Sequence, residues 1–289
     1  MARVILLLCA AWPFAFAQST NIEFGTVTRP VIEQRLRAFE NTNVKRELRL
    51  RELFEEAGCT ADSLTEQRVK HAKAPNVICT LAGNSDAGVS EARSIIVGAH
   101  FDFVDRGKGV VDNWSGCSLL PSLLESLKST PRHHTFVFIG FTDEEKGLVG
   151  SRFYVHELGK DGREKIRAMV NMDSLGTSPT KFELDRGDKT LVRELEVVAA
   201  NFKLPLHIVN VHRVGRSDSD SFQDAKIPAI CIHSLTNETW PLLHSPRDQI
   251  SAMRLHDYYE TYLLLRAYLA YLDVTLYQRQ LEHGVTEPE

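Results

Sequence analysis

The chain has 289 residues, of which 43% are hydrophobic and 25% are charged, which is enough apolar sequence to bury one large core. This composition argues against a disordered protein. The formal net charge is −4, and the basic residues are scattered rather than clustered. We therefore expect one globular domain that binds neither nucleic acid nor an anionic membrane surface.

The first residues have the pattern of a cleaved export signal. Arg3 precedes a short apolar stretch, and a small-x-small pattern, Ala-Phe-Ala, ends at Ala17. A retained membrane anchor is the weaker interpretation, because a span needs about 20 apolar residues. We expect residues 1–17 to be a signal peptide and residues 18–289 to be one catalytic domain. The mature protein would then be secreted or periplasmic, without a stable membrane anchor.

Along the rest of the chain, helical and strand patterns alternate. The continuous Ile/Val/Phe runs are typical of strands that are buried on both faces. The alternation predicts an α/β fold with a mostly parallel, mixed central sheet sandwiched by helices. In chain order, we expect two helices within 30–57, strands at 76–81 and 94–100, a helix at 115–128, a strand from 135, a helix at 148–158, a strand at 168–172, a helix at 189–202, a strand at 227–233 and a helix at 254–277.

Export would leave four cysteines in the mature chain, and four cysteines allow three pairings. Cys59 and Cys79 flank a polar segment outside the presumed site, so we expect this pair to form the disulfide. Cys117 and Cys231 lie in apolar contexts that are typical of buried thiols. No Cys-x-x-Cys motif occurs, which argues against zinc bound by thiolates.

Five acidic or imidazole side chains follow the apolar runs or lie in turns. In open α/β sheets, ligands bind at the carboxyl ends of the strands, so these side chains are expected to converge. Imidazole nitrogen combined with carboxylate oxygen suits zinc, with manganese or cobalt as substitutes. Two such metals can hold a bridging hydroxide and polarise a carbonyl group. The five candidate ligands are His100, Asp112, Glu145, Asp173 and His244.

The neighbours of these ligands suggest separate roles. Asp102 stands two residues after His100, on the same face if the strand continues, and is expected to orient that histidine. Asp112 precedes a helix, where it can bridge two cations or merely cap the helix. Glu144 and Glu145 would repel each other at the end of a buried strand unless a cation neutralises them. Glu145 would then ligate, while Glu144 accepts the proton of a zinc-held water; the alternative is a solvated acidic turn.

Six motifs occur in a fixed order: His-x-Asp, Asp-Asn-x-Ser-Gly, Asp-Glu-Glu-x-Gly-x-x-Gly-Ser, Asn-x-Asp, Gly-Arg-Ser-Asp and His-Ser-Pro-x-Asp. Over roughly residues 75–275, this series resembles the secreted zinc aminopeptidase family that also contains glutaminyl cyclases. The resemblance implies a strained, often cis, peptide bond between Asp112 and Asn113. It also implies a site in which Asp112 bridges the metals, His100 and Asp173 hold one zinc, Glu145 and His244 hold the other, and Glu144 is the general base.

The chain departs from this family pattern at two positions. Aminopeptidases of the family commonly carry a tyrosine before the last histidine, and the cyclases a tryptophan, whereas this chain has Leu243. The tyrosine hydroxyl can stabilise the oxyanion, and Leu243 has no such donor. Loss of one oxyanion donor typically costs about 10²–10³ in rate unless another group replaces it. In the Gly-Arg-Ser-Asp motif, the histidine that often follows is replaced by Ser219. Arg216 and Asp218 of this motif are candidate substrate contacts, although Arg216 is equally consistent with a surface arginine.

The sequence therefore predicts a zinc-dependent exopeptidase with two zinc ions, acting on peptide substrates through a metal-bound hydroxide. The first alternative is a glutaminyl-peptide cyclase with one zinc, which would form N-terminal pyroglutamate on the same framework. A binding module without activity is less favoured. Inactive proteins that resemble this family lose metal ligands or the general base, whereas this chain keeps them. The remaining histidines, including His233, are interpreted as surface or core residues. The oligomeric state is left open, and the candidate pocket residues are Phe103, Trp114, Phe222 and Trp240.

Overall fold

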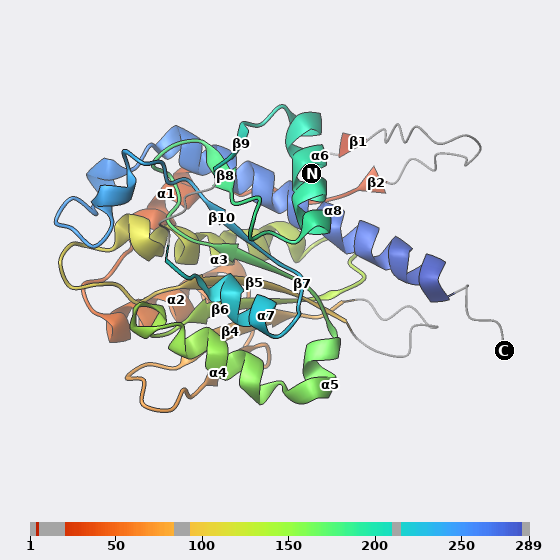
Figure 1. Cartoon of the computed structure of the whole chain (residues 1–289), viewed down its shortest axis with the longest axis horizontal. Coiled ribbons are helices and arrows are strands. Elements are labelled where there is room, and N and C mark those ends of the chain that lie inside the picture. Colours follow the sequence, from red (N-terminus) through yellow and green to blue (C-terminus); the bar gives the residue numbers. More distant parts are fainter. Residues whose placement is uncertain (1–3, 6–20, 84–92, 210–214, 285–289) are drawn as a thin grey trace.

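The computed structural model describes residues 4–5, 21–83, 93–209 and 215–284 (Figure 1). The strands are β1 (Val4–Ile5), β2 (Asn21–Ile22), β3 (Leu64–Gln67), β4 (Asn76–Leu81), β5 (Ser94–His100), β6 (Thr135–Phe141), β7 (Ile166–Met172), β8 (Thr180–Phe182), β9 (Leu206–Ile208) and β10 (Ala229–His233). The α-helices are α1 (Arg29–Arg37), α2 (Asn43–Ala57), α3 (Ser115–Leu127), α4 (Val149–Glu157), α5 (Gly159–Glu164), α6 (Lys189–Phe202), α7 (Asp218–Asp224) and α8 (Leu255–Gly284).

The centre of the fold is an eight-stranded sheet in the order β3-β4-β6-β5-β7-β10-β8-β9. The four middle strands, β6, β5, β7 and β10, run parallel to one another. Antiparallel pairing begins on either side of them, at β4 and at β8. This topology confirms the expected mixed, mostly parallel sheet, and it brings the carboxyl ends of the four middle strands to one edge.

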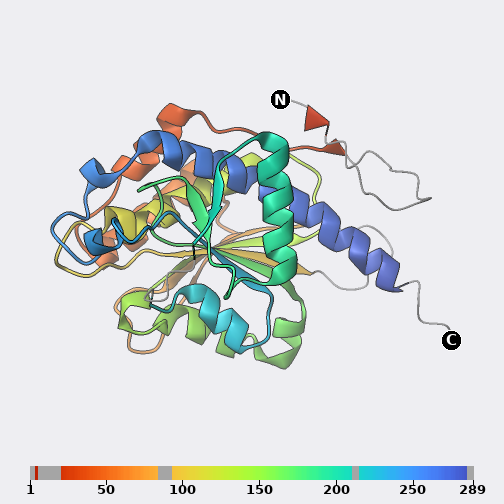
Figure 2. The ribbon, with the colours of Figure 1, turned by 45° about the horizontal axis from the view of Figure 1, so that its top comes forward.

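Helices cover both faces of the sheet, as Figure 2 shows most clearly. One layer contains α1, α2, α3, α6 and α8, and the other contains α4, α5 and α7. The side chains of β5 alternate between the two layers: Ile95 and Val97 pack on the α3 side, whereas Ile96 packs in the smaller core of the other side. Burial on both faces explains the continuous apolar runs of these strands.

Helix α3 is buried along almost its whole length, because it lies between the sheet and the other helices of its layer. Small residues let its neighbours approach closely. A Cβ atom on Gly116 would meet the Asn113 side chain and the Met172 carbonyl at 2.6 Å. The hydroxyls of Ser118 and Ser126 bond those of two tyrosines in α8, at 2.8 and 2.7 Å. The buried tyrosines of α8 therefore form a packing face.

The long elements agree with the sequence prediction to within a few residues, except that α8 continues past residue 277 to Gly284. The strands and α-helices that sequence analysis missed are β1, β2, β3, β8, β9, α5 and α7, which have two to seven residues each. Elements of this length are too short to show a clear hydrophobic period, and tertiary contacts determine them.

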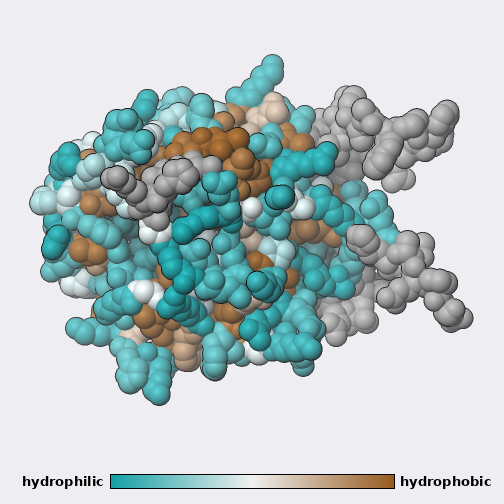
Figure 3. Space-filling view, in the orientation of Figure 1, coloured by the Kyte–Doolittle hydropathy of each residue, from teal (hydrophilic) through white to brown (hydrophobic). Residues whose placement is uncertain are grey.

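The expected signal peptide, residues 1–17, lies outside the described residues apart from Val4–Ile5, which pairs with Asn21–Ile22. None of the described helices is long and apolar enough to cross a membrane. The face drawn in Figure 3 is mainly hydrophilic, and apolar area gathers near the β8–β9 edge of the sheet. Ile208 in β9 and Leu184 after β8 are among the exposed large apolar side chains.

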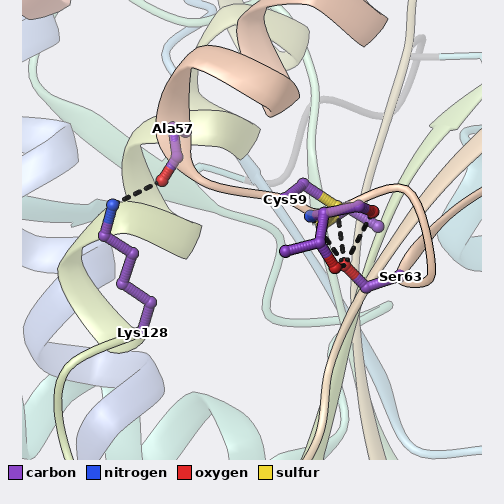
Figure 4. The surroundings of a disulfide bond; sticks show 6 residues. Ala57, Cys59, Ser63 and Lys128 are labelled. Carbon is purple, nitrogen blue, oxygen red and sulfur yellow. Dashed lines mark hydrogen bonds between the residues drawn. A yellow bond between two sulfur atoms is a disulfide. The ribbon is translucent and has the colours of Figure 1, made fainter.

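Cys59 and Cys79 form a disulfide that joins the end of α2 to β4, which confirms the expected pair (Figure 4). The adjacent backbone is held by a second contact, in which Lys128 Nζ donates to the Ala57 carbonyl at 2.7 Å. Among the described cysteines, Cys117 is a buried thiol and Cys231 a half-buried one.

We predict that replacing both Cys59 and Cys79 with serine lowers the free energy of unfolding by about 2–4 kcal/mol, because the unfolded chain regains the freedom of the closed loop. Urea unfolding of the purified protein measures this change. Cys231→Ser is the control, because it removes a thiol without breaking a cross-link. Equal stability of the double variant and the wild type would contradict a stabilising role for this bond.

Candidate metal centre

The five candidate ligands meet at the carboxyl edge of the parallel strands. Because β6, β5 and β7 are neighbours in the sheet, side chains at their ends lie within reach of one another. Two turns complete the group, one before α3 and one after the short helix of residues 240–242. His100 ends β5, Asp173 follows β7, Glu145 lies in the turn after β6, Asp112 lies before α3, and His244 lies in the loop after residue 242.

Asp112 stands between two separate groups. Its Oδ1 atom is 3.3 Å from His100 Nε2, which is itself 3.7 Å from Asp173 Oδ1. Its Oδ2 atom is 3.1 Å from His244 Nε2, which lies 3.0 Å from Glu145 Oε2. Each group could hold one metal ion, with ligand atoms within 4.8 Å of one another. The two oxygens of one carboxylate thus face two sites, the arrangement expected of a bridging ligand.

Asp102 connects the histidine to the acidic turn. The His100 Nδ1 atom is 3.2 Å from the Asp102 carbonyl oxygen and 3.5 Å from its Oδ1. The same carboxylate accepts the backbone N–H groups of Glu144 at 3.0 Å and Glu145 at 3.2 Å. The predicted contact is present, but the reasoning from strand periodicity was wrong, because β5 ends at His100 and Asp102 lies in the following loop.

A second carboxylate, which sequence analysis missed, holds the bridging residue in place. Asp248 accepts the backbone N–H groups of Val111 at 2.7 Å and Asp112 at 3.2 Å. Burial raises the pKa of Asp248 to about 6. The signal was present, because Asp248 is the last residue of the His-Ser-Pro-x-Asp motif. The loop that carries His244 therefore also positions Asp112.

Arg46, on helix α2, holds the loop between β5 and α3 through bonds to its backbone. Its fully buried guanidinium donates to the Phe101 carbonyl at 3.1 Å and to the Lys108 carbonyl. It lies over the ring of Phe103 at 4.1 Å and over that of Trp114 at 5.7 Å. Sequence analysis gave this residue no role, because a single arginine in a charged helix gives no sign of burial.

Asn113 ties the start of α3 to the end of β7. Its side chain donates to the Met172 carbonyl at 2.8 Å and accepts from the N–H groups of Gly116 at 3.0 Å and Ser174 at 3.2 Å. The Asp112–Asn113 peptide bond is cis, as the family resemblance implied. Asn113 thus caps the helix, and Asp112 is left to face the metal centre.

Electrostatic coupling within the centre is strong. Burial works against a charge on His100, yet Glu144 and the carboxylates hydrogen-bonded to the ring raise its pKa well above the usual range. Hydrogen bonds with Asp112 and Glu145 raise the pKa of the half-exposed His244 to about 10. Burial raises the pKa of Glu144, whose Oε2 atom lies 3.9 Å from His100 Nε2. The carboxylates therefore favour the protonated form of both imidazoles.

A cavity of about 490 Å³ opens beside these residues. Its wall includes Trp240 and Leu243, and also His233, which sequence analysis had left among the surface or core residues. The other aromatic candidates lie elsewhere: Trp114 and Phe222 are fully buried in the core, and Phe103 lies under Arg46. These three assignments to the pocket were wrong.

The two candidate substrate contacts have different positions. Arg216 lines the cavity, where it forms ion pairs with Asp224 and, at 3.7 Å, with Asp220. Asp218 is fully buried as the first residue of α7 and lies outside the cavity wall, so the structure does not place it against a substrate. Burial raises the pKa of Asp218 to about 7. The error arose because the short helix α7, which turns this side chain inward, was not predicted.

Several proteins with similar sequences are named aminopeptidases. The chain is 33% identical over 165 residues to aminopeptidase YwaD of Bacillus subtilis, a match that covers 54% of this chain and 36% of that protein. It is 29% identical over 164 residues to leucine aminopeptidase 2 of Trichophyton rubrum, covering 53% and 32% of the two chains. The matched segment thus spans about a third of the length of these relatives.

Solved structures share the fold. A zinc aminopeptidase from Bacillus subtilis, BSAP, has 25% identity and a TM-score of 0.61, covering 68% of this chain and 49% of its own. The LapA aminopeptidase of Legionella pneumophila has 22% identity and a TM-score of 0.74, covering 86% and 72%. A glutaminyl cyclase from an Acidobacteriales bacterium has 15% identity and a TM-score of 0.69, covering 93% and 100%. The model of peptidase family M28 matches residues 76–268, well over half of the sequence, so the chain belongs to this family.

Proposed function

We propose that this protein is a zinc-dependent aminopeptidase that releases N-terminal residues from peptides. The observation that carries the proposal is the position of Asp112, whose two oxygens face two imidazole–carboxylate groups. The buried Glu144 stands beside them. A cavity large enough for an amino-acid side chain opens from this centre.

The donor set fits zinc. Three carboxylates and two imidazoles surround the centre, and both imidazoles direct Nε2 toward it. The Nδ1–H of His100 points to the Asp102 carbonyl, which leaves the lone pair of Nε2 available for a metal. Zinc bound in these two groups would polarise a carbonyl oxygen and lower the pKa of a water molecule.

Glu144 is the residue suited to move the proton. Its side chain is mostly buried and lies beside His100. The neighbouring Glu145 instead contacts His244. A carboxylate whose pKa is raised by burial can take a proton from the attacking water and return it to the leaving amine. Two backbone bonds to Asp102 hold the turn that carries Glu144 and Glu145.

A glutaminyl-peptide cyclase is the second candidate. A glutaminyl cyclase shares this fold over 93% of the chain. Leu243 in the cavity wall matches neither the tyrosine of the aminopeptidases nor the tryptophan of the cyclases. The two activities give different products. A panel of aminoacyl and glutaminyl peptides, assayed with metal-quantified protein, separates them: an aminopeptidase releases free amino acids, whereas a cyclase releases ammonia and leaves pyroglutamate on the peptide. Ammonia without any amino acid would overturn the peptidase proposal.

We predict that the protein binds close to two zinc ions per chain and that Asp112→Ala loses most of both, because one carboxylate serves both groups. Metal analysis of dialysed protein measures this loss. Asp105→Ala is a matched control, since Asp105 is an exposed residue of the same loop. Retention of two zinc ions by Asp112→Ala would rule out the bridging role.

Glu144→Gln should keep its zinc and lose about 10²–10⁴ in kcat, because the change removes the proton carrier without removing a ligand. Metal content and the rate of amino-acid release are measured on the same sample. Glu157→Gln, at an exposed site on α4, is the control. If Glu144→Gln instead released zinc, the roles given to Glu144 and Glu145 would have to be exchanged.

Zinc removal should make stability depend on pH. In the metal-free protein, the pKa of His244 is raised to about 10 by Asp112 and Glu145, and burial raises that of Glu144. The folded state then holds more protons than the unfolded chain, so the free energy of unfolding falls as pH rises from about 6.5 to about 10.

Thermal unfolding of chelator-treated protein across this range should therefore show a falling Tm. Zinc should remove most of the dependence, because the metal replaces the protons on the ligands. A Tm of the metal-free protein that stays constant across this pH range would show that these groups do not exchange protons with unfolding.

A further inference from the structure

His233 lies in the cavity wall, one strand away from the metal centre. It is the last residue of β10, which pairs in parallel with β7 so that Ile232 is opposite Met172. The backbone N–H of Asp173 donates to the Ile232 carbonyl at 2.9 Å, so the register continues and places His233 beside Asp173. Neighbouring strands lie about 4.8 Å apart, and this spacing fixes the position of His233 relative to the centre.

The tautomer of His233 is determined by its backbone. The N–H of Leu235 donates to His233 Nδ1 at 3.1 Å, which requires a lone pair on that nitrogen. Burial lowers the pKa of His233 to about 4, with a smaller effect from Lys181, its cross-strand neighbour on β8. The ring is therefore neutral near pH 7, and its single N–H is on Nε2.

This Nε2–H group has no partner within the described part of the protein, although the side chain is only 5% exposed. A buried donor left unpaired costs about 1–3 kcal/mol, and such groups are rare in folded proteins. The adjacent Lys181 does not serve as a partner: it is itself a donor, and it is bonded to Ser178 and to the Pro179 carbonyl. The Nε2 atom is itself buried behind the cavity wall, so the ring must shift slightly before a molecule in the cavity supplies the missing acceptor.

The surroundings favour an uncharged acceptor. Three arginines line the cavity: Arg216 is ion-paired with Asp224 and Arg186 with Glu183 at 3.8 Å, while Arg152 on α4 is exposed. The carboxylates of Glu183 and Asp220 in the same wall work against a negatively charged side chain. Because His233 is neutral, it offers a hydrogen bond without a positive charge. Cys231 lies two residues before His233 on the same face of β10, and it extends the cavity wall away from the metal centre. An amide or hydroxyl side chain along β10 would fit these groups better than a carboxylate.

We propose that the Nε2–H group of His233 donates a hydrogen bond to the side chain of the substrate's N-terminal residue and selects residues with an amide or hydroxyl oxygen. This assignment rests on the proposed aminopeptidase function and specifies its substrate class. A pocket built to hydrogen-bond a polar side chain discriminates strongly against an apolar one of the same shape, because the buried donor is then left unpaired.

Asparagine and leucine test this proposal, because their side chains have nearly the same shape and only asparagine carries an acceptor. Calorimetry of zinc-loaded protein gives the Kd of each free amino acid, and turnover of asparaginyl and leucyl peptides gives kcat/KM. The wild type should prefer asparagine in both measurements. His233→Phe should lower the asparagine-to-leucine ratio by about 10–100-fold, the effect of one buried hydrogen bond.

Two further variants separate this role from a structural one. His233→Gln keeps an N–H donor and should restore most of the ratio, even if its overall affinity is lower. His207→Phe makes the same substitution at an exposed site on β9 and should leave the ratio unchanged. A preference of the wild type for leucine, or an equal loss for both ligands in His233→Phe, would overturn the proposal.

The two measurements also separate this inference from the proposed function. If no peptide is turned over but asparagine binds better than leucine in a His233-dependent way, the aminopeptidase proposal fails and the role of His233 stands. If amino acids are released from peptides with the same ratio in wild type and His233→Phe, the function stands and the role of His233 is refuted.

Discussion

The concentration of negative charge around Asp112 is the constraint on which the rest of the site depends. Four carboxylates, those of Asp112, Glu144, Glu145 and Asp173, converge on two imidazoles at the edge of the sheet. Like charges at this distance repel strongly when they are buried, so cations or protons must balance them. The surrounding structure serves to hold these groups together against that repulsion.

The restraint comes from elements that are distant in the sequence. Asp248 binds the backbone before Asp112, Asn113 joins α3 to β7, and the buried Arg46 fixes the loop between β5 and α3. Asp102 holds the acidic turn through its backbone. Most of these contacts use backbone groups, which have little freedom to move. The geometry of the ligands is therefore set by the fold more than by the ligands themselves.

Sequence patterns predicted the parts of this arrangement that local chemistry determines. Long apolar runs identified β5 and β6. Because ligands bind at the carboxyl ends of such strands, the same runs then selected His100 and Glu145. The positions of Asp248 and Arg46 depend on contacts that span tens of residues or more, and no local period reports them. His233 is a different case. It ends an apolar run as His100 does, so the same rule would have selected it had it been applied to every strand.

The parallel pairing of β7 and β10 fixes the distance between two groups of the cavity wall, the carboxylate of Asp173 and the imidazole of His233. Asp173, a carboxylate of the candidate metal centre, directly follows β7, and β10 ends in the neutral donor His233. Because the two strands are hydrogen-bonded in register, this distance cannot change without breaking the centre of the sheet. The loops around the mouth, which include Trp240 and Leu243, can then vary in shape without altering the spacing between the ends of these two strands.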